Sequence, residues 1–354
     1  MSERFKILGV VIAALVIGVI LFPPAVSAWF LNAANAQIAR ATTADSPERA
    51  VALANANTYI TQARQFANEP RLSLAQARVL LARGEAAWVG KALANVVLDD
   101  DPIVQFIRAD AAWQLRETEV AFAHWRAAGA LVYFVNQAYR ALDKHEWRDA
   151  ENFARIAVGI APDQADAHYA LGDALSRQNV ADPAALRELK RTESLTRDPD
   201  IKSRALSRQG EILAEQGELR DALDVFQRAR GIASLDARPR TGYALTKLQL
   251  DPGARDESVA LLEQVVGDSP WYTAAYIALS QIAEENRDAL GAETWLKTGL
   301  AQNPNDPRLL LPLGELYARQ NRVTDAKEML AFALKHETHT DSRQAITRAL
   351  EKLQ

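Results

Sequence analysis

The sequence predicts an all-α fold in which pairs of helices stack along a repeat array. From Ser46 onward, apolar residues recur at positions i, i+3, i+4 and i+7 in blocks of about 12 to 15 residues, and no sustained alternation of β-branched and polar residues occurs. The breaks between blocks are regular, because a polar residue often precedes a proline there. Two segments near the C-terminus also resemble each other at a separation of 34 residues. A fixed period of this length is typical of a helical solenoid.

The N-terminal segment is apolar enough to enter a bilayer. Ile7–Phe22 is a run of sixteen uncharged residues preceded by Arg4 and Lys6, and no further positive charge occurs before Arg40. Basic residues that flank a spanning segment are retained on the cytoplasmic side. We therefore expect a single transmembrane helix within residues 1–31, a cytoplasmic N-terminus and an extracytoplasmic remainder at the cell membrane.

A cleaved signal peptide is the alternative interpretation of this segment. Val26 and Ala28 are small residues at the −3 and −1 positions of a cleavage site after Ala28. The apolar run is longer than the usual core of a signal peptide, and Trp29 and Phe30 suit the membrane interface of an uncleaved anchor. The anchor is the interpretation adopted here, with secretion after cleavage as the alternative.

Polar residues followed by proline divide the rest of the chain. In most of these pairs the polar side chain is able to cap free backbone N–H groups, while the proline occupies the first helical position, where its missing N–H costs nothing. The pairs are expected to mark helix starts. They are Ser46-Pro47, Asp101-Pro102, Asp182-Pro183, Asp198-Pro199, Asp251-Pro252, Ser269-Pro270, Asn303-Pro304 and Asp306-Pro307.

The repeat unit becomes clear when Tyr276–Pro304 is aligned with Leu310–Thr338. Identical or similar residues then lie 34 positions apart, with small residues at recurrent places and leucines between them. This pattern resembles the tetratricopeptide repeat (TPR), which has Gly or another small residue at position 8 and Ala at positions 20 and 27. In the last unit, counted from Pro307, the family's marked positions hold Leu310, Leu313, Gly314, Tyr317, Ala326, Leu330, Ala333 and Thr338.

The resemblance extends over most of the chain and sets the expected domain boundaries. After the membrane segment at 1–31, residues 32–70 are expected to form a linker and a lead-in helix, the latter over 46–68. A TPR-like solenoid of about eight helix pairs follows at 71–338, clearest from 131, and residues 339–354 form a C-terminal capping helix. One unit is assigned a start at Leu235, which places Gly242 at position 8. The family resemblance implies a right-handed superhelix whose concave surface is lined by the first helix of each pair.

Chemistry-bearing motifs are absent from the sequence. There is no G-x-G-x-x-G, G-x-x-x-x-G-K-[ST], G-x-S-x-G or H-E-x-x-H, and no cysteine occurs. A net charge of −4 gives no electrostatic footprint for nucleic acid. His336 and His339 share a helical spacing, and Asp99–Asp101 is acidic, but a solvated pair and a helix cap are the simpler explanations. We expect no catalytic residue, no metal and no cofactor.

If the array binds a partner, the inward positions 2, 5, 9 and 12 of the first helices are the expected contact residues. They are Asp166, Tyr169, Asp173, Ser176, Arg204, Ser207, Glu211, Tyr243, Thr246, Ile277, Gln281, Glu284, Arg308 and Glu315. A groove of mixed charge with tyrosines suits an extended peptide or a partner helix. The carboxylate clamp of the family's chaperone-binding members has Lys at position 5 and Asn at position 9, and here Tyr169 and Asp173 occupy those positions.

These observations favour a membrane-anchored, extracytoplasmic TPR scaffold that mediates protein–protein interactions in cell-envelope assembly. Arginine outnumbers lysine and alanine is abundant, a composition that suits a GC-rich bacterial genome. The alternative is an envelope factor that binds or assembles polysaccharide through tryptophan and arginine side chains. An enzyme is the least favoured class, because no catalytic motif is present.

Overall fold

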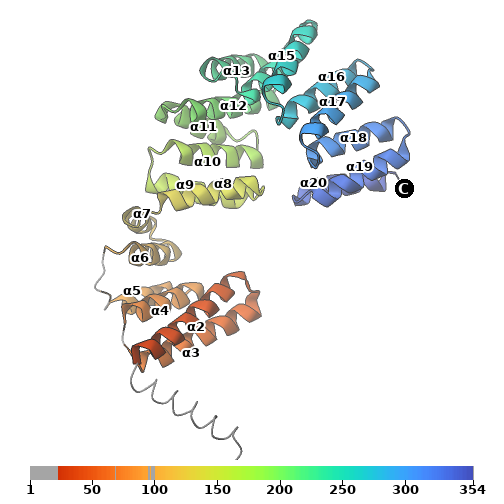
Figure 1. The fold of residues 1–354 in the computed structure, drawn as a ribbon. Coiled ribbons are helices and arrows are strands. Elements are labelled where there is room, and N and C mark those ends of the chain that lie inside the picture. The colour runs from red at the N-terminus through yellow and green to blue at the C-terminus, as the bar shows by residue number, and fades with distance from the viewer. Residues whose placement is uncertain (1–22, 68, 95, 97–99, 354) are drawn as a thin grey trace, which may run out of the picture. The chain divides into compact units, whose positions relative to one another are not determined.

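The computed structural model describes residues 23–353 except 68, 95 and 97–99, and over these residues the regular secondary structure is helical (Figure 1). The chain divides into two compact units. Unit 1 extends to Tyr133 and includes Gly159–Ala161, and unit 2 comprises Phe134–Val158 and the residues from Pro162 onward.

Unit 1 contains the N-terminal helices. Their bounds are α2 (Pro23–Thr43), α3 (Ser46–Arg64), α4 (Pro70–Ala82), the short 3₁₀ helix η1 (Ala86–Trp88), α5 (Val89–Leu93), α6 (Pro102–Gln114) and α7 (Thr118–Ala127). One core cluster joins α2, α3 and α4 through small and branched side chains such as Ala34, Ile60 and Leu72, all of them 1% exposed or less. Small residues at these contacts let the helices approach closely.

Unit 2 contains the regular array, and in Figure 1 its helices follow one another pairwise along an arc toward the C-terminus. The first and second helices of each pair alternate in chain order, and α20 ends the array. Their bounds are α8 (Leu131–Asp143, which begins in unit 1), α9 (Trp147–Ile160, which ends in unit 1), α10 (Ala165–Gln178), α11 (Pro183–Leu195), α12 (Pro199–Glu215), α13 (Leu219–Ile232), α14 (Ala237–Leu250), η2 (Pro252–Ala254), α15 (Arg255–Asp268), α16 (Thr273–Glu285), α17 (Ala289–Gln302), α18 (Pro307–Arg319), α19 (Val323–His336) and α20 (Thr340–Glu351).

The N-terminal boundary differs from the sequence interpretation. Helix α2 continues without a break from Pro23 to Thr43, so residues 32–43 are helical where a linker was expected. The reason is packing, because Leu31 and Ala34 on α2 are buried against Ala56 and Ile60 on α3. Residues 1–22, which hold most of the predicted membrane segment, lie outside the described residues. Among the helices that the structure describes, none combines the length and the apolar character that a membrane span requires.

Most of the polar-proline pairs mark helix starts, as expected. The side chains of Asp101, Asp182, Asp198 and Asp306 each accept a hydrogen bond from a backbone N–H in the first turn of the helix that follows. Such caps satisfy donors that have no partner within the helix.

Two of the polar-proline pairs follow a helix end, and in a third pair the residue before the serine is the helix cap. Ser269 and Asn303 end α15 and α17 as C-cap residues, and the prolines that follow them lie in the turns before α16 and α18. Proline suits this place because it cannot continue a helix. Asp45, rather than Ser46, caps α3.

Close helix contacts explain the small residues of the repeat. A Cβ atom added to Gly172 would lie 2.7 Å from Leu189 Cγ, and one added to Gly314 would lie 2.7 Å from Leu330 Cγ. In both repeats the glycine is at position 8 on the first helix, and the leucine is on the second helix. At Gly172 and Gly314 a larger residue would push the two helices apart.

The register of the unit around α14 is shifted by two residues from the sequence assignment. Asp236 caps α14, and its Oδ2 accepts a hydrogen bond of 2.9 Å from Ser203 Oγ. The equivalent contact two units later joins Thr273 Oγ1 to Asp306 Oδ2 at 2.7 Å. Because Asp236 corresponds to Asp306, position 1 of this unit is Ala237 rather than Leu235.

Candidate functional site

The first helices α8, α10, α12 and α14 place a group of charged and aromatic side chains side by side. Successive first helices contact one another, so a given repeat position recurs beside itself along the array. We call the surface formed by α8, α10, α12, α14, α16 and α18 the first-helix face. Its most connected part, here the tyrosine–arginine cluster, consists of Tyr139, Asp166, Tyr169, Asp173, Arg204, Arg208, Glu211 and Arg238.

One half of the cluster is a cation on two stacked rings. Tyr139 and Tyr169 have ring centroids 6.2 Å apart with an interplanar angle of 25°, and Tyr139 Oη donates a 3.2 Å hydrogen bond to Asp166 Oδ1. The Arg204 guanidinium lies 4.5 Å from the Tyr169 centroid and 5.4 Å from that of Tyr139. Burial raises the pKa of Tyr139 further above its ordinary value, so the Tyr139 ring remains a neutral π-surface.

The other half is a network of ion pairs in which Arg208 is buried and Glu211 and Arg238 are partly buried. Arg238 makes a fork with Glu211, donating from Nε to Oε1 at 2.6 Å and from Nη2 to Oε2 at 2.7 Å. Arg208 donates to the same carboxylate at 2.9 Å and pairs through Nε with Asp173 Oδ1 at 3.0 Å. Burial by itself would raise the pKa of Glu211, but hydrogen bonds and positive charge from Arg238 and Arg208 lower it to about 2. The carboxylate is therefore ionised at any physiological pH.

Arg204 is different from the other two arginines of the cluster. Arg208 and Arg238 both pair with carboxylates, whereas no ion pair within 4.0 Å among the described residues includes Arg204. Its side chain is exposed, and the positive charge of Arg238 lies close enough to act on it. The two rings thus hold an oriented guanidinium whose charge is not neutralised by a carboxylate in contact with it.

Of the residues expected from the sequence, six meet in or against this cluster. Asp166, Tyr169, Asp173, Arg204 and Glu211 are members. The sixth, Ser176, accepts a 3.0 Å hydrogen bond from Arg208 Nε. Three of these residues are too buried to offer much surface to a partner: Tyr169 is 3% exposed, Asp173 9% and Ser176 4%.

The remaining expected residues lie elsewhere. Tyr243 packs under Arg230 of α13 at 4.3 Å, Glu284 accepts from Arg319 at 2.7 Å, and Arg308 bonds to Asp306 at 2.7 Å. The other five residues do not belong to the cluster. Ser207 and Thr246 are buried, Ile277 is partly buried, and Gln281 and Glu315 are exposed.

Sequence reasoning missed Arg208, Arg238 and Tyr139. Arg238 would have appeared at position 2 if the unit had been counted from Ala237, and Tyr139 is at position 9 of the unit that begins at Leu131. Arg208 is at position 6, which the positional rule does not select. Its burial of 97% and its two carboxylate partners became visible only in the structure.

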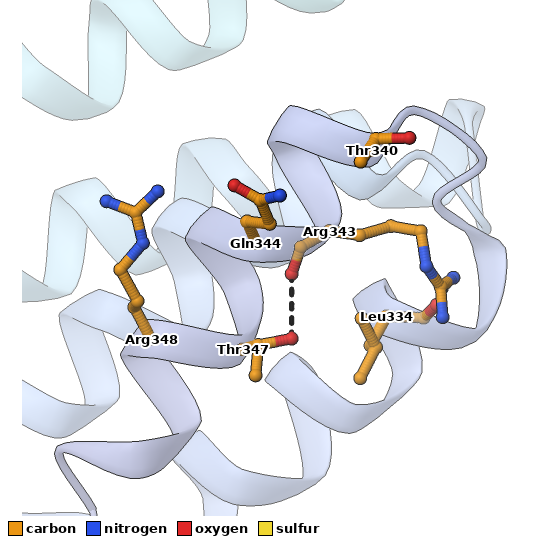
Figure 2. A pocket seen from close by; sticks show the side chains of 6 residues that line it. All are labelled: Leu334, Thr340, Arg343, Gln344, Thr347 and Arg348. Carbon is orange, nitrogen blue, oxygen red and sulfur yellow. Dashed lines mark hydrogen bonds between the residues drawn. The ribbon is translucent and has the colours of Figure 1, made fainter.

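One hollow among the described residues is separate from the cluster. It measures about 460 Å³ and lies over α19 and α20 (Figure 2). Arg343 lines it, but its Nη1 donates 2.7 Å hydrogen bonds to the carbonyl oxygens of Leu334 and Glu337. That guanidinium satisfies free carbonyls after α19, so we assign it a structural role.

Metal-site geometry is not found in the part of the chain that the structure describes, where no three His, Asp or Glu side chains converge on a common point. His336 packs edge-on against Phe332 and His339 stacks on His145, so the two histidines of the sequence pair face different neighbours. Asp101, from the acidic run before α6, serves as that helix's N-cap.

The described helices form an all-α repeat solenoid, and comparisons with known proteins identify the repeat. A family model of the tetratricopeptide repeat matches residues 249–311. A tetratricopeptide repeat protein from Parabacteroides merdae is 12% identical, with a TM-score of 0.53 over 80% of this chain and 98% of its own. A thermophilic TPR protein from Thermus thermophilus is 20% identical, with a TM-score of 0.45 over 53% of this chain and 100% of its own. PilF of Pseudomonas aeruginosa is 16% identical, with a TM-score of 0.43 over 62% and 97%.

A search of curated protein sequences gives no significant match. The chain contains the tetratricopeptide repeat that its 34-residue spacing indicated, and the family model places it at residues 249–311. At these identities the solved structures show the fold alone. The matched family is a repeat family rather than a catalytic one, and TPR proteins typically act as scaffolds that bind proteins or peptides.

Proposed function

We propose that this protein is a membrane-anchored, extracytoplasmic scaffold that holds a partner polypeptide of the cell envelope along its first-helix face. The location rests on the sequence of residues 1–31, whose basic flank precedes the apolar run. The binding mode rests on the tyrosine–arginine cluster. Tyrosine and arginine are the residue types that most often dominate the energy of protein interfaces.

The observation that carries the binding proposal is the state of Arg204. The guanidinium is exposed, oriented by Tyr139 and Tyr169, and without a carboxylate partner among the described residues. A partner that places an Asp or Glu side chain there forms a charge-assisted, bidentate pair without disturbing the ion pairs of Arg208 and Arg238. We therefore infer that the partner segment is acidic at this point.

A random 12-residue peptide library, displayed on phage and selected on the purified protein, tests this proposal. Peptides enriched on the parent are expected to carry acidic residues and to lose binding to the variant Arg204→Gln by roughly ten-fold or more, the usual effect of removing one interface anchor. Arg155→Gln is the matched control, because Arg155 is an exposed arginine paired with Glu151 on its own helix, α9.

The outcomes separate the two ligand classes considered. Enriched peptides that lack acidic residues, or that bind Arg204→Gln as well as they bind the parent, would contradict the proposal. Retention of purified envelope polysaccharide without enrichment of any peptide would support the alternative, a polysaccharide-binding factor. Trp271, which is 70% exposed, offers an indole ring on which a sugar could stack in that alternative.

A further inference from the structure

Two turns that are far apart in the sequence meet in unit 2. The turn between α8 and α9 and the connector between α19 and α20 line a common cleft of about 560 Å³. In this cleft the imidazole rings of His145 and His339 stack with centroids 3.6 Å apart and an interplanar angle of 10°. The contact joins the first helix pair of the unit to its C-terminal end.

The fold places His145 at the tip of its hairpin. Its φ is 60°, a left-handed conformation that Gly84 and Gly217 adopt in other turns of the array. The N–H groups of His145 and Glu146 bond to the carbonyls of Leu142 and Ala141 at 3.1 and 2.8 Å, which closes the end of α8. The turn is therefore well defined, and the imidazole it presents occupies a defined position.

The two imidazoles belong to a longer stack of rings and cations. His145 also stacks on Trp147 at 4.7 Å, and the Arg177 guanidinium lies 5.8 Å from the Trp147 ring. Neutral imidazoles pack favourably in such a stack. If both rings are protonated, two unit charges lie within about 4 Å of each other, and Arg177 adds a third nearby.

The other charged groups around the contact do not remove this repulsion. Lys144 and Glu146 flank His145 in its own turn, and Glu337 and Asp341 flank His339. The Glu337 carboxylate, which is 8% exposed, already accepts 2.8 Å hydrogen bonds from the backbone N–H groups of Thr338 and His339. Burial lowers the pKa of His145. The positive charges of His339 and Arg177 lower this pKa further, and Glu337 and Asp341 oppose the shift only in part.

We propose that the His145–His339 stack is a pH-sensitive latch that holds unit 2 closed end to end and opens on acidification. The sign follows from linkage: His145 binds its proton more weakly in the closed state than in the open state, where its pKa is near 6.5. Closure is therefore complete above that pH and is lost as the pH falls below it. An open unit admits a partner segment to the first-helix face sideways, so this inference extends the proposed function to its regulation.

The absence of cysteine from the sequence gives a clean way to measure the latch. Cysteines introduced at the exposed positions Asp149 on α9 and Ala345 on α20 carry spin labels on the full chain, and pulsed electron resonance reports their separation. A single short separation is expected at about pH 7.5. At about pH 5 the ratio of short to long separations should fall about fivefold or more, the factor that corresponds to repulsion between two unit charges about 4 Å apart in water.

Two variants of the labelled protein assign the effect. His339→Phe keeps an aromatic ring on His145 but removes one charge, so the unit should stay closed at both pH values. His336→Gln removes a histidine of the same segment that packs edge-on against Phe332 rather than on His145, and it should keep the pH response.

Three results would overturn the latch: no short separation at any pH, an unchanged short population at pH 5 in the parent, or a full pH response in His339→Phe. The measurement needs no partner. The latch and the proposed function therefore fail separately, because loss of peptide selection leaves the label separations unaffected.

Discussion

Replacement of Glu211 by glutamine should destabilise the centre of unit 2 in a pH-dependent way. The carboxylate holds Arg238 by a two-bond fork and Arg208 by a third bond, and its pKa falls from 4.5 to about 2. At about 1.4 kcal/mol per pKa unit, this shift corresponds to about 3 kcal/mol of stabilisation at neutral pH. The glutamine keeps the size of the side chain but leaves Arg238 without its carboxylate partner and Arg208 with Asp173 alone.

The pH window follows from the direction of the shift. A carboxylate whose pKa is lowered in the folded state contributes fully above its unfolded pKa of about 4.5, and the contribution is lost as the pH falls toward 2. The difference between parent and Glu211→Gln should therefore be about 3 kcal/mol at pH 7 and should shrink below pH 4.5.

Hydrogen exchange read out by mass spectrometry suits this test, because Glu211 and its two arginines lie on α12 and α14, where the loss of protection should concentrate. Glu215→Gln, at the exposed end of α12, is the matched control and should leave exchange unchanged. Equal protection of α12 and α14 in the parent and in Glu211→Gln at pH 7 would refute the assignment of this network as a stabilising one.

Three further predictions address packing, burial and topology. Ala326→Leu overfills a fully buried helix contact and should lower the free energy of unfolding by about 1–3 kcal/mol. Ala331→Leu, at an exposed position of the same helix, should leave it unchanged. Equal denaturant midpoints for the two variants would show that the repeat register is wrong. Burial raises the pKa of Asp110 to about 6, and the carboxylate accepts from Trp125 Nε1 at 3.2 Å, so its ionisation weakens unit 1 as the pH rises from about 4 through 6. Asp110→Asn should then raise stability at pH 7 by about 3 kcal/mol, and a variant less stable than the parent would contradict this reasoning. A reporter that fluoresces only in the cytoplasm, fused after Gln354, should be dark in cells, and a bright fusion would reverse the proposed topology.

The sequence by itself determined the fold class of this protein and the local structure of its units. Periodicity, caps and small residues act over one or two helical turns or one repeat, so a single sequence carries their signal. Asp306 before Pro307 predicted a helix start, and Gly314 with Ala326 predicted a close contact between α18 and α19. The structure confirms both.

The tertiary structure decided which side chains work together. Arg238 on α14 contacts Glu211 on α12, in the preceding repeat. A two-residue error in the register assigned to α14 was enough to hide that pair from sequence reasoning. The His145–His339 contact joins turns almost 200 residues apart, and no local pattern records it. Both contacts depend on the rotation that accumulates from repeat to repeat. Small differences in helix packing set that rotation, and the composition of any one repeat does not reveal it.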